Sequence, residues 1–253
     1  MRTLVTSSTR GIGFGIARAL SICGAIVTVN GREEETVKKA VEKLPTGRAY
    51  GVAADLSAEG EAARLVREAA KHMGGLDSLV YVPPPPPRGR IGELEWSDWR
   101  LSYRLLVEAP VEAVDEAVPF LEKSSNPSIA FVTSIAAWEP MEDIATSSVL
   151  RPGLHNLTVL LARQLAGKGI RVNAVVPGLI LTDRLRGIAR SRAEALGKSE
   201  EEVLREMAES VPLGRLGRPL DIGWVVAFLA SPKASYVTGA IIPVTGGLHR
   251  SPH

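Results

Sequence analysis

A glycine-containing turn near the N-terminus has the composition and spacing of a phosphate site. The segment from Val5 to Gly13 reads as the end of a strand, a turn that includes Gly11, and the start of a helix. Backbone N–H groups at a helix start attract anions, and glycine lets a phosphate approach the backbone closely. A tight turn that binds nothing is the alternative, because glycine also begins helices for packing reasons. The place of the turn between a strand and a helix favours phosphate binding.

The residues after the second expected strand indicate which nucleotide would bind. A carboxylate there usually accepts hydrogen bonds from the ribose hydroxyls of NAD, whereas the 2′-phosphate of NADP needs a cation. This chain has Asn30 followed by Gly31 and Arg32, and Arg10 stands in the glycine turn. The sequence therefore predicts NADP(H); NAD remains the alternative if both arginines are ordinary solvated surface residues.

The glycine turn resembles the fingerprint of the short-chain dehydrogenase/reductase family. Thr6, Gly11 and Gly13 match that fingerprint, whereas Ser7 replaces its first glycine. The serine adds a Cβ where the backbone approaches the cofactor, so we expect weaker binding or an adjusted turn. Asp55, after the third expected strand, matches the acidic position that contacts adenine in the family.

Further matches continue the resemblance over nearly the whole chain. Residues 173–178 with Thr182 match the Asn-x-x-x-Pro-Gly segment that lies beside the nicotinamide, and residues 245–247 resemble the C-terminal turn of the family. The resemblance implies cofactor contacts in the glycine turn and at the strand ends, namely Thr6, Ser8, Arg10, Gly11, Ile12, Gly13, Arg32, Asp55, Leu56, Pro177, Gly178, Ile180 and Thr182.

The catalytic residues of that family are mostly replaced in this chain. The resemblance implies a serine that polarises the substrate oxygen, and Ser134 matches it at the end of the fifth expected strand. Ser147 and Arg151 replace the tyrosine and lysine that exchange the proton, and Leu106 replaces an asparagine that holds a water. An aliphatic hydroxyl is a much poorer acid than a phenol, and an arginine stays protonated. We therefore expect slow proton transfer.

Another residue could supply the missing phenol. Tyr103 precedes Leu106 by three residues on an expected helix, so the two share a face, and we hypothesise that Tyr103 lies at the site. The alternative is a buried helix aromatic whose hydroxyl is bonded locally. A serine hydrolase built on Ser134, His155 and Asp143 is disfavoured, because the chain has no Gly-x-Ser-x-Gly turn.

These observations predict an oxidoreductase, similar to the oxoacyl-carrier-protein reductases, that transfers a hydride between NADP(H) and a small carbonyl or alcohol. The candidate catalytic residues are Ser134, Ser147, Arg151 and Tyr103. A catalytically inactive relative that binds a nucleotide or metabolite in a structural or regulatory role is the alternative. No metal is expected.

Two loops next to the expected site have unusual compositions. Five consecutive prolines, residues 83–87, stand where the family has Asn-Asn-Ala-Gly. They lack backbone donors and favour a stiff segment of about 15 Å, so we expect a rigid connector or a subunit contact. After Ser134, the carboxylates of Glu139, Glu142 and Asp143 either favour a polar or cationic ligand or are ordinary exposed acids.

The elements that must position these residues follow an alternating pattern. Apolar runs of strand length at residues 2–6, 25–29, 50–54, 79–82, 128–133, 170–176 and 240–244 alternate with helical segments. This pattern is typical of βαβ units and a parallel sheet. Together with the resemblance, it predicts one Rossmann-like, doubly wound α/β domain over residues 1–253 with about seven strands. A polar, helix-favouring insertion at about 183–212 is expected to form a lid.

Two prolines bear on the expected helices. Pro110 is expected to interrupt a helical stretch over residues 96–121. Pro152 disfavours helical geometry at Arg151 and predicts a helix that begins there. In that case Arg151 would not be equivalent to the lysine of the family.

Composition narrows the possible partners. A net charge of +2 without blocks of like charges gives no support for nucleic acid or a membrane surface as a partner. Cys23 is the only cysteine, which excludes an internal disulfide, and no apolar run approaches the ~20 residues of a membrane span. With no charged and apolar leader before the first strand, we expect a cytoplasmic protein. The resemblance implies a small-molecule substrate and a homodimer or homotetramer.

Overall fold

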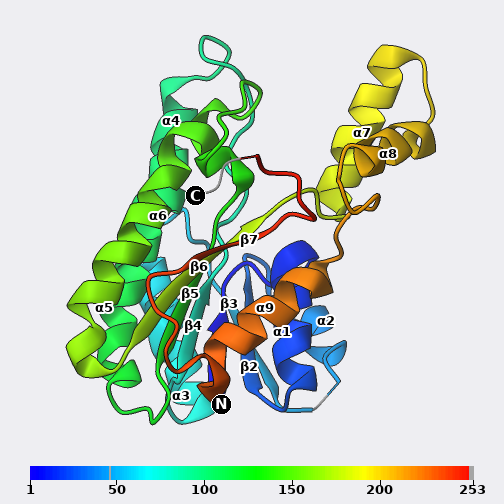
Figure 1. Cartoon of the computed structure of the whole chain (residues 1–253). Coiled ribbons are helices and arrows are strands. Elements are labelled where there is room, and N and C mark those ends of the chain that lie inside the picture. Colours follow the sequence, from blue (N-terminus) through cyan, green and yellow to red (C-terminus); the bar gives the residue numbers. More distant parts are fainter. Residues whose placement is uncertain (46, 251–253) are drawn as a thin grey trace.

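Seven parallel strands form one central sheet (Figure 1). The computed structural model describes residues 1–45 and 47–250. Its strands are β1 (Arg2–Val5), β2 (Ile26–Gly31), β3 (Ala49–Ala53), β4 (Ser78–Tyr81), β5 (Ser128–Val132), β6 (Arg171–Pro177) and β7 (Ile241–Val244). They lie in the order β3-β2-β1-β4-β5-β6-β7, which confirms the predicted doubly wound sheet. The strand order reverses between β1 and β4, and open α/β sheets bind ligands at the carboxyl ends of such strands.

Helices cover both faces of the sheet, as Figure 1 shows. One face carries α1 (Gly11–Ile22), α2 (Glu34–Glu42) and α9 (Pro219–Ala230). The other carries α3 (Glu61–Met73), α5 (Ala109–Leu121) and α6 (Ala145–Gln164). Helix α4 (Trp96–Tyr103) packs on α6 beyond the carboxyl edge of the sheet (Figure 1). The result is a three-layer α/β/α arrangement with a hydrophobic core on each side of the sheet.

Strand β5 illustrates why the strands read as continuous apolar runs. Successive side chains of a strand point to opposite faces. Ile129 and Phe131 pack in the core beneath α5 and α6, whereas Ala130 and Val132 pack in the core beneath α1 and α9. Both faces are covered, so every residue of β5 is buried and the strand has no polar face.

The stretch from α4 to α5 stays helical, but its α geometry is interrupted just before Pro110. A π-helical turn, Arg104–Glu108, joins the two helices. Pro110 lies at the second position of α5, so the α-helical stretch is interrupted beside the predicted proline, by a change of helix type. The buried hydroxyl of Tyr81 donates a 2.8 Å hydrogen bond to the carbonyl oxygen of Leu105 within the π turn. The chain departs from regular α geometry in the turn that precedes the proline.

Helix α6 begins at Ala145, two turns before the start that Pro152 predicted, so this prediction is wrong. Contacts outside the helix stabilise the early turns, because Thr146 donates to the carbonyl oxygen of Pro87 at 3.2 Å and Ser148 donates to that of Met141 at 3.0 Å. These tertiary contacts outweigh the local preference set by the proline. One continuous helix therefore carries both Ser147 and Arg151.

Two helices, α7 (Asp183–Leu196) and α8 (Glu200–Glu209), occupy the predicted insertion. Figure 1 shows them projecting beyond the carboxyl edge of the sheet, packed on each other. Thr182 caps α7 by accepting a hydrogen bond from the N–H of Leu185, and Ser199 caps α8 by accepting one from Glu202. No helix in the described part of the chain combines the length and hydropathy needed to span a bilayer.

Candidate active site and cofactor cavity

A cavity of about 770 Å³ opens at the carboxyl ends of the central strands. It extends from the turn after β1 past the ends of β2, β3 and β4 to the end of β5, and it also reaches the start of α7. The predicted site residues that line it are Arg10, Gly11, Ile12, Gly13, Arg32, Asp55, Leu56, Arg151 and Thr182. The structure thus brings together most of the predicted cofactor contacts and one predicted catalytic residue.

The glycine turn has the geometry of a close backbone approach. A Cβ on Gly13 would lie 2.8 Å from the Cα of Ser8 and closer still to the carbonyl oxygen of Ser7, so no other residue fits. Ser7 itself adopts the left-handed region with φ 45°, which is where its glycine counterpart in the family fingerprint would be unstrained. The side chain of Asn30 holds this strained residue, because its Oδ1 accepts a 3.0 Å hydrogen bond from the Ser7 N–H.

Thr6 and Ser8 are buried and do not line the cavity, contrary to their prediction as direct cofactor contacts. The Thr6 hydroxyl donates to the carbonyl oxygen of Val82 at 2.8 Å and accepts from the Val82 N–H at 2.7 Å. The Ser8 hydroxyl donates to the carbonyl oxygen of Val5 at 2.6 Å and accepts from the N–H of Asn30 at 2.9 Å. Both side chains therefore fix the turn to neighbouring strands.

The segment after β6 contacts other parts of the chain and does not line the cavity before Thr182. Pro177, Gly178 and Ile180 do not line it, although the sequence predicted that they would. A Cβ on Gly178 would lie 2.8 Å from the Cα of Thr245, so this glycine allows the chain to pass the C-terminal turn. Ile180 is buried and pairs with Gly217. These contacts fix the direction in which the chain reaches Thr182.

Arg151 reaches the cavity from α6 as a buried cation. Its guanidinium group donates a 2.8 Å hydrogen bond from Nη1 to the carbonyl oxygen of Thr133, and the residue is only 8% exposed. Its Nε has no hydrogen-bond partner among the described residues. Burial, followed by repulsion from Arg184, lowers the pKa of Arg151 to about 10. The group therefore remains a cation at neutral pH, and the residue lines the cavity.

The two predicted catalytic serines lie beside the cavity but are not part of its lining. Ser147 is 4% exposed and precedes Arg151 by four residues in α6, so both are on one face of the helix. Ser134 caps a short 3₁₀ turn, where its hydroxyl accepts a 3.2 Å hydrogen bond from the N–H of Ala136. The residue of this strand end that does line the cavity is Thr133.

Tyr103 does not face the cavity, contrary to the prediction. Its side chain is 47% exposed, whereas Leu101 and Leu105, four residues apart, line the cavity from the same helical stretch. A residue two positions after Leu101 points to the opposite side of a helix. Leu106 is fully buried in the core, and the π turn separates it from Tyr103, so the two do not share the face that sequence spacing indicated.

A buried histidine lies behind Thr133. The Nε2 atom of His155 is 2.9 Å from the Thr133 hydroxyl, and its ring packs against Trp138 with centroids 5.2 Å apart. Burial, followed by the positive charge of Arg151, lowers the pKa of His155 to about 4. The imidazole is therefore neutral near pH 7. This pairing also disagrees with the hydrolase alternative, because His155 contacts Thr133 rather than Ser134.

Several lining residues were not predicted from sequence. Prolines 83–86 form one wall, and the arginines Arg88 and Arg184 line the cavity from the loop after β4 and from the first turn of α7. Arg184 follows the capping residue Thr182 by two positions, which is the one sequence signal that placed it near the site. Within residues 1–45 and 47–250, no cluster of three or more His, Cys, Asp or Glu side chains could hold a metal.

Comparisons with known proteins agree with this geometry. A family model described as enoyl-(acyl carrier protein) reductase matches residues 6–249. Among characterised sequences, human dehydrogenase/reductase SDR family member 4 is 38% identical over 248 residues, which cover 96% of this chain and 86% of that protein.

Solved structures extend the likeness to the whole fold. L-sorbose reductase from Gluconobacter frateurii, in complex with NADPH and L-sorbose, superposes with a TM-score of 0.93 at 27% identity over 98% of this chain and 96% of that chain. A short chain oxidoreductase from Pseudomonas aeruginosa PAO1, described as containing an atypical catalytic center and solved with NADPH, superposes with a TM-score of 0.88 at 27% identity over 98% of this chain and 96% of that chain.

Proposed function

Because the chain belongs to the short-chain dehydrogenase/reductase family, we propose that it is an oxidoreductase that transfers a hydride between NADP(H) and a small carbonyl or alcohol. One observation carries the proposal: Arg10 and Arg32, beside the glycine turn, line the same cavity as Thr133 and Arg151. The cavity is therefore continuous from a phosphate-binding turn to the position of the family's catalytic lysine.

The charge around the end of β2 supports NADP(H) over NAD(H). Asn30 supplies no carboxylate for ribose hydroxyls, and its amide is already bonded to the carbonyl oxygens of Val52 and Ala54, each at 3.2 Å. Arg10 and Arg32 are exposed at this end of the cavity. A 2′-phosphate would pair with these two guanidinium groups, whereas NADH has an uncharged hydroxyl group at that position.

Arg151 and Ser147 would take the places of the family's lysine and tyrosine. When bound, the nicotinamide supplies a hydride to a carbonyl carbon, and the substrate oxygen must gain a proton to give the alcohol. Arg151 stays protonated, so its role is to stabilise negative charge that develops on that oxygen. Ser134 and Ser147 stand at the positions that the family resemblance assigns to polarising the oxygen and to passing it a proton, here taken from water. An aliphatic hydroxyl makes this step slower than a phenol would.

A second candidate function is a catalytically inactive relative that binds a nucleotide or metabolite in a structural or regulatory role. The observation that favours it is the position of the serines, because neither Ser134 nor Ser147 lines the cavity. The predicted cofactor contacts that line the cavity do not include either serine. Such a protein would bind NADPH and consume none of it.

The two functions differ in a direct assay. Titration of the purified protein with NADPH and NADH, followed by calorimetry, measures cofactor binding and preference. A panel of ketones, aldehydes and keto acids, followed by loss of NADPH absorbance, measures turnover. Consumption supports the enzyme, whereas tight NADPH binding without consumption across the panel supports the inactive relative. Failure to bind either nucleotide contradicts both.

Replacement of Gly13 tests the proposed cofactor cradle. In Gly13→Ala the new methyl group would collide with the backbone at Ser8, so we expect NADPH affinity to fall by about tenfold or more. Gly187→Ala on α7 is the matched control, because its Cβ would meet nothing within 4 Å. Thermal unfolding of both variants separates loss of binding from loss of fold. Unchanged affinity in a folded Gly13→Ala protein contradicts the cradle.

Replacement of Arg32 tests the cofactor preference. We expect Arg32→Gln to reduce the ratio of NADPH to NADH affinity by about tenfold, because the 2′-phosphate loses a charged donor. Arg186→Gln is the control, since Arg186 pairs with Glu200 at 3.2 Å and does not line the cavity. An unchanged ratio in Arg32→Gln means that the arginine is a solvated surface residue.

Three further parts of the proposal concern the whole protein. We propose that α7 and α8 form a lid, since Thr182, Asp183 and Arg184 line the cavity at the start of α7. Hydrogen exchange in α7 should slow when NADPH is added. A homodimer or homotetramer and a cytoplasmic location stay predictions, the first open to light scattering and the second to microscopy of the tagged protein.

A further inference from the structure

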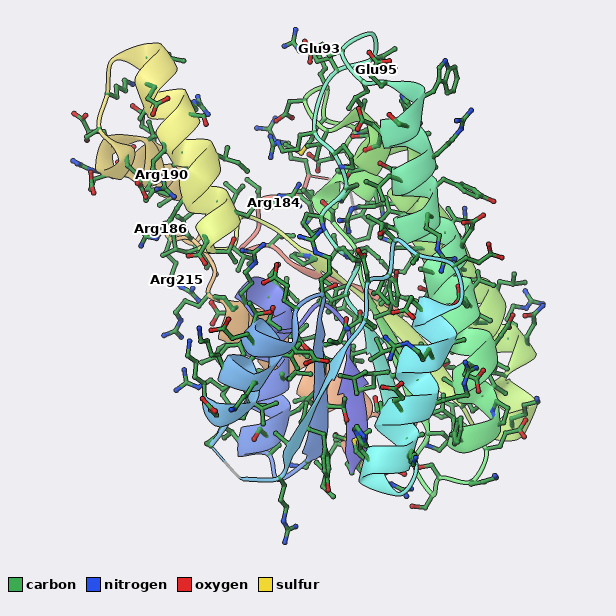
Figure 2. All side chains as sticks on the ribbon, turned by 180° about the vertical axis from the view of Figure 1, so that it is seen from behind. Glu93, Glu95, Arg184, Arg186, Arg190 and Arg215 are labelled. Carbon is green, nitrogen blue, oxygen red and sulfur yellow. The ribbon has the colours of Figure 1, made fainter. Side chains whose placement is uncertain are left out.

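The end of the cavity beside β4, β5 and α7 concentrates positive charge, from the buried Arg151 and the exposed Arg88 and Arg184. Arg88, Arg151 and Arg184 come from three separate segments, the loop after β4, α6 and the first turn of α7, and all three line the cavity. Figure 2 shows Arg184 at the base of α7, between this helix and the body of the molecule, whereas Arg186 and Arg190 lie farther along the helix. Guanidinium groups from distant parts of the sequence thus meet at one place.

The charges of Arg151 and Arg184 are not neutralised by carboxylates of the described residues. Arg151 donates only to a neutral carbonyl group, and its buried Nε has no partner in the described chain. The side chain of Arg184 makes no hydrogen bond or ion pair with any residue of ranges 1–45 and 47–250. Burial, followed by repulsion from Arg88, lowers the pKa of Arg184, and Arg184 in turn lowers that of Arg151. Each arginine therefore disfavours the charge on the next.

Nearby acidic side chains form no ion pair with Arg151 or Arg184 within the described part of the chain. Asp143 pairs with Arg88 at the rim of the cavity, Glu142 lies 3.5 Å from Arg90, and Glu139 accepts a hydrogen bond from the N–H of Arg250. None of these three carboxylates lines the cavity. The sequence-based alternative of a cationic ligand for these acids therefore has no support in the structure. Asp55 and Asp183 do line the cavity, but Asp55 accepts a hydrogen bond from Ser57 and neither pairs with an arginine of the described residues.

The cofactor's own phosphates do not account for the cluster. The phosphate-binding turn follows β1, whereas Arg151 bonds to Thr133 directly after β5, two strands away in the order β1-β4-β5. Neighbouring strands are about 4.8 Å apart, so the two places are separated by about 10 Å. The turn also has Arg10 and Arg32 beside it. Arg151 is therefore in excess of what the turn needs. The start of α7 lies nearer the turn, because a Cβ on Gly11 would be 3.6 Å from the Thr182 methyl group. For Arg184, an experiment must therefore separate cofactor binding from oxyanion binding.

We propose that the substrate of this site carries an oxyanion, a carboxylate or a phosphate, close to its reacting carbonyl or alcohol, and that Arg151 and Arg184 bind it with Arg88 at the rim. This inference rests on the proposed oxidoreductase function and narrows its substrate class. Planar guanidinium groups match the geometry of both carboxylate and phosphate oxygens. An anion between them would also remove the mutual repulsion of the arginines.

Binding of small probes to the NADPH-saturated protein tests the inference. Calorimetry compares oxamate with oxamide, which differ in one carboxylate, and adds inorganic phosphate as a second oxyanion. We expect oxamate or phosphate to bind about tenfold or more tightly than oxamide. Arg184→Gln should weaken that binding by about tenfold while NADPH affinity changes less than threefold. Arg186→Gln, on the same helix but outside the cavity, should leave both affinities unchanged.

The outcomes separate this inference from the proposed function. Equal affinity for oxamate, phosphate and oxamide overturns the oxyanion site. A loss of NADPH affinity in Arg184→Gln with oxyanion binding intact also overturns it, because the arginine then serves the cofactor. If the protein binds no NADPH, the proposed function fails; oxyanion binding to the free protein that Arg184→Gln weakens would then still support the site. Arg151→Gln, checked for folding by thermal unfolding, provides a second variant with the same expected loss.

Discussion

His155 should make the stability of this protein sensitive to mild acid. The imidazole is 7% exposed, and its Nε2 lies 2.9 Å from the hydroxyl of Thr133. Burial first, and then the positive charge of Arg151, lower its pKa from 6.5 to about 4. Between these two pKa values His155 is protonated in the unfolded chain and neutral in the folded chain, so acid favours unfolding.

The magnitude follows from the two pKa values. The stabilisation that neutral His155 gives is present in full above pH 6.5 and is lost as the pH falls from there through about 4. The free energy of unfolding should therefore fall by about 2 kcal/mol between about pH 7.5 and about pH 5 from this group alone. In a chain of this size, that change lowers the Tm by about 4–8 °C.

Urea and thermal unfolding at the two pH values measure the effect. His155→Gln keeps a hydrogen-bond acceptor for Thr133 but cannot titrate. Between the two pH values, its free energy of unfolding should therefore fall by about 2 kcal/mol less than that of the wild type. His72→Gln is the matched control, because this exposed histidine on α3 should leave the wild-type acid dependence in place. If His155→Gln loses as much stability as the wild type, the buried neutral imidazole is not the cause and the argument fails.

Three further predictions concern stability. Although burial opposes it, hydrogen bonds from Arg2 lower the pKa of Asp77 from 3.8 to about 2. The resulting stabilisation is present above pH 3.8 and lost as the pH falls through 2. With screening by solvent taken into account, Asp77→Asn should lower the free energy of unfolding by about 1–2 kcal/mol in urea at neutral pH. Tyr81→Phe leaves the carbonyl oxygen of Leu105 without its buried donor and should cost about 1–2 kcal/mol, with faster amide exchange in the π turn. Ser7→Gly removes the strain of a positive φ and should raise stability by up to about 1 kcal/mol; a decrease in the Tm would mean that the serine side chain stabilises the turn.

The fold was accessible from sequence because its signals are local. Apolar runs such as 128–133 are long enough to be strands and too apolar to have an exposed face, which indicates a parallel sheet. The glycine turn was equally readable, since Gly13 stands where only glycine fits. By contrast, the start of α6 was missed because contacts from Thr146 and Ser148 override the local effect of Pro152.

The composition of the site was only partly accessible. Thr6 and Ser8 match a motif, but which side of the loop their side chains face depends on hydrogen bonds to distant strands. Tyr103 was misplaced because a regular helix was assumed where the chain forms a π turn. Arg88 and Arg184 are separated by nearly a hundred residues and meet only through the sheet topology, which no local pattern records.

The proline wall at residues 83–86 makes the cavity chemically one-sided. A proline has no backbone N–H, so this wall can accept hydrogen bonds but donates none. Oxygen-rich parts of any bound molecule must turn toward the arginines and the glycine turn, and carbon-rich parts must lie on the prolines. The orientation of a bound molecule therefore depends on the wall that lacks hydrogen-bond donors as well as on the walls that supply them.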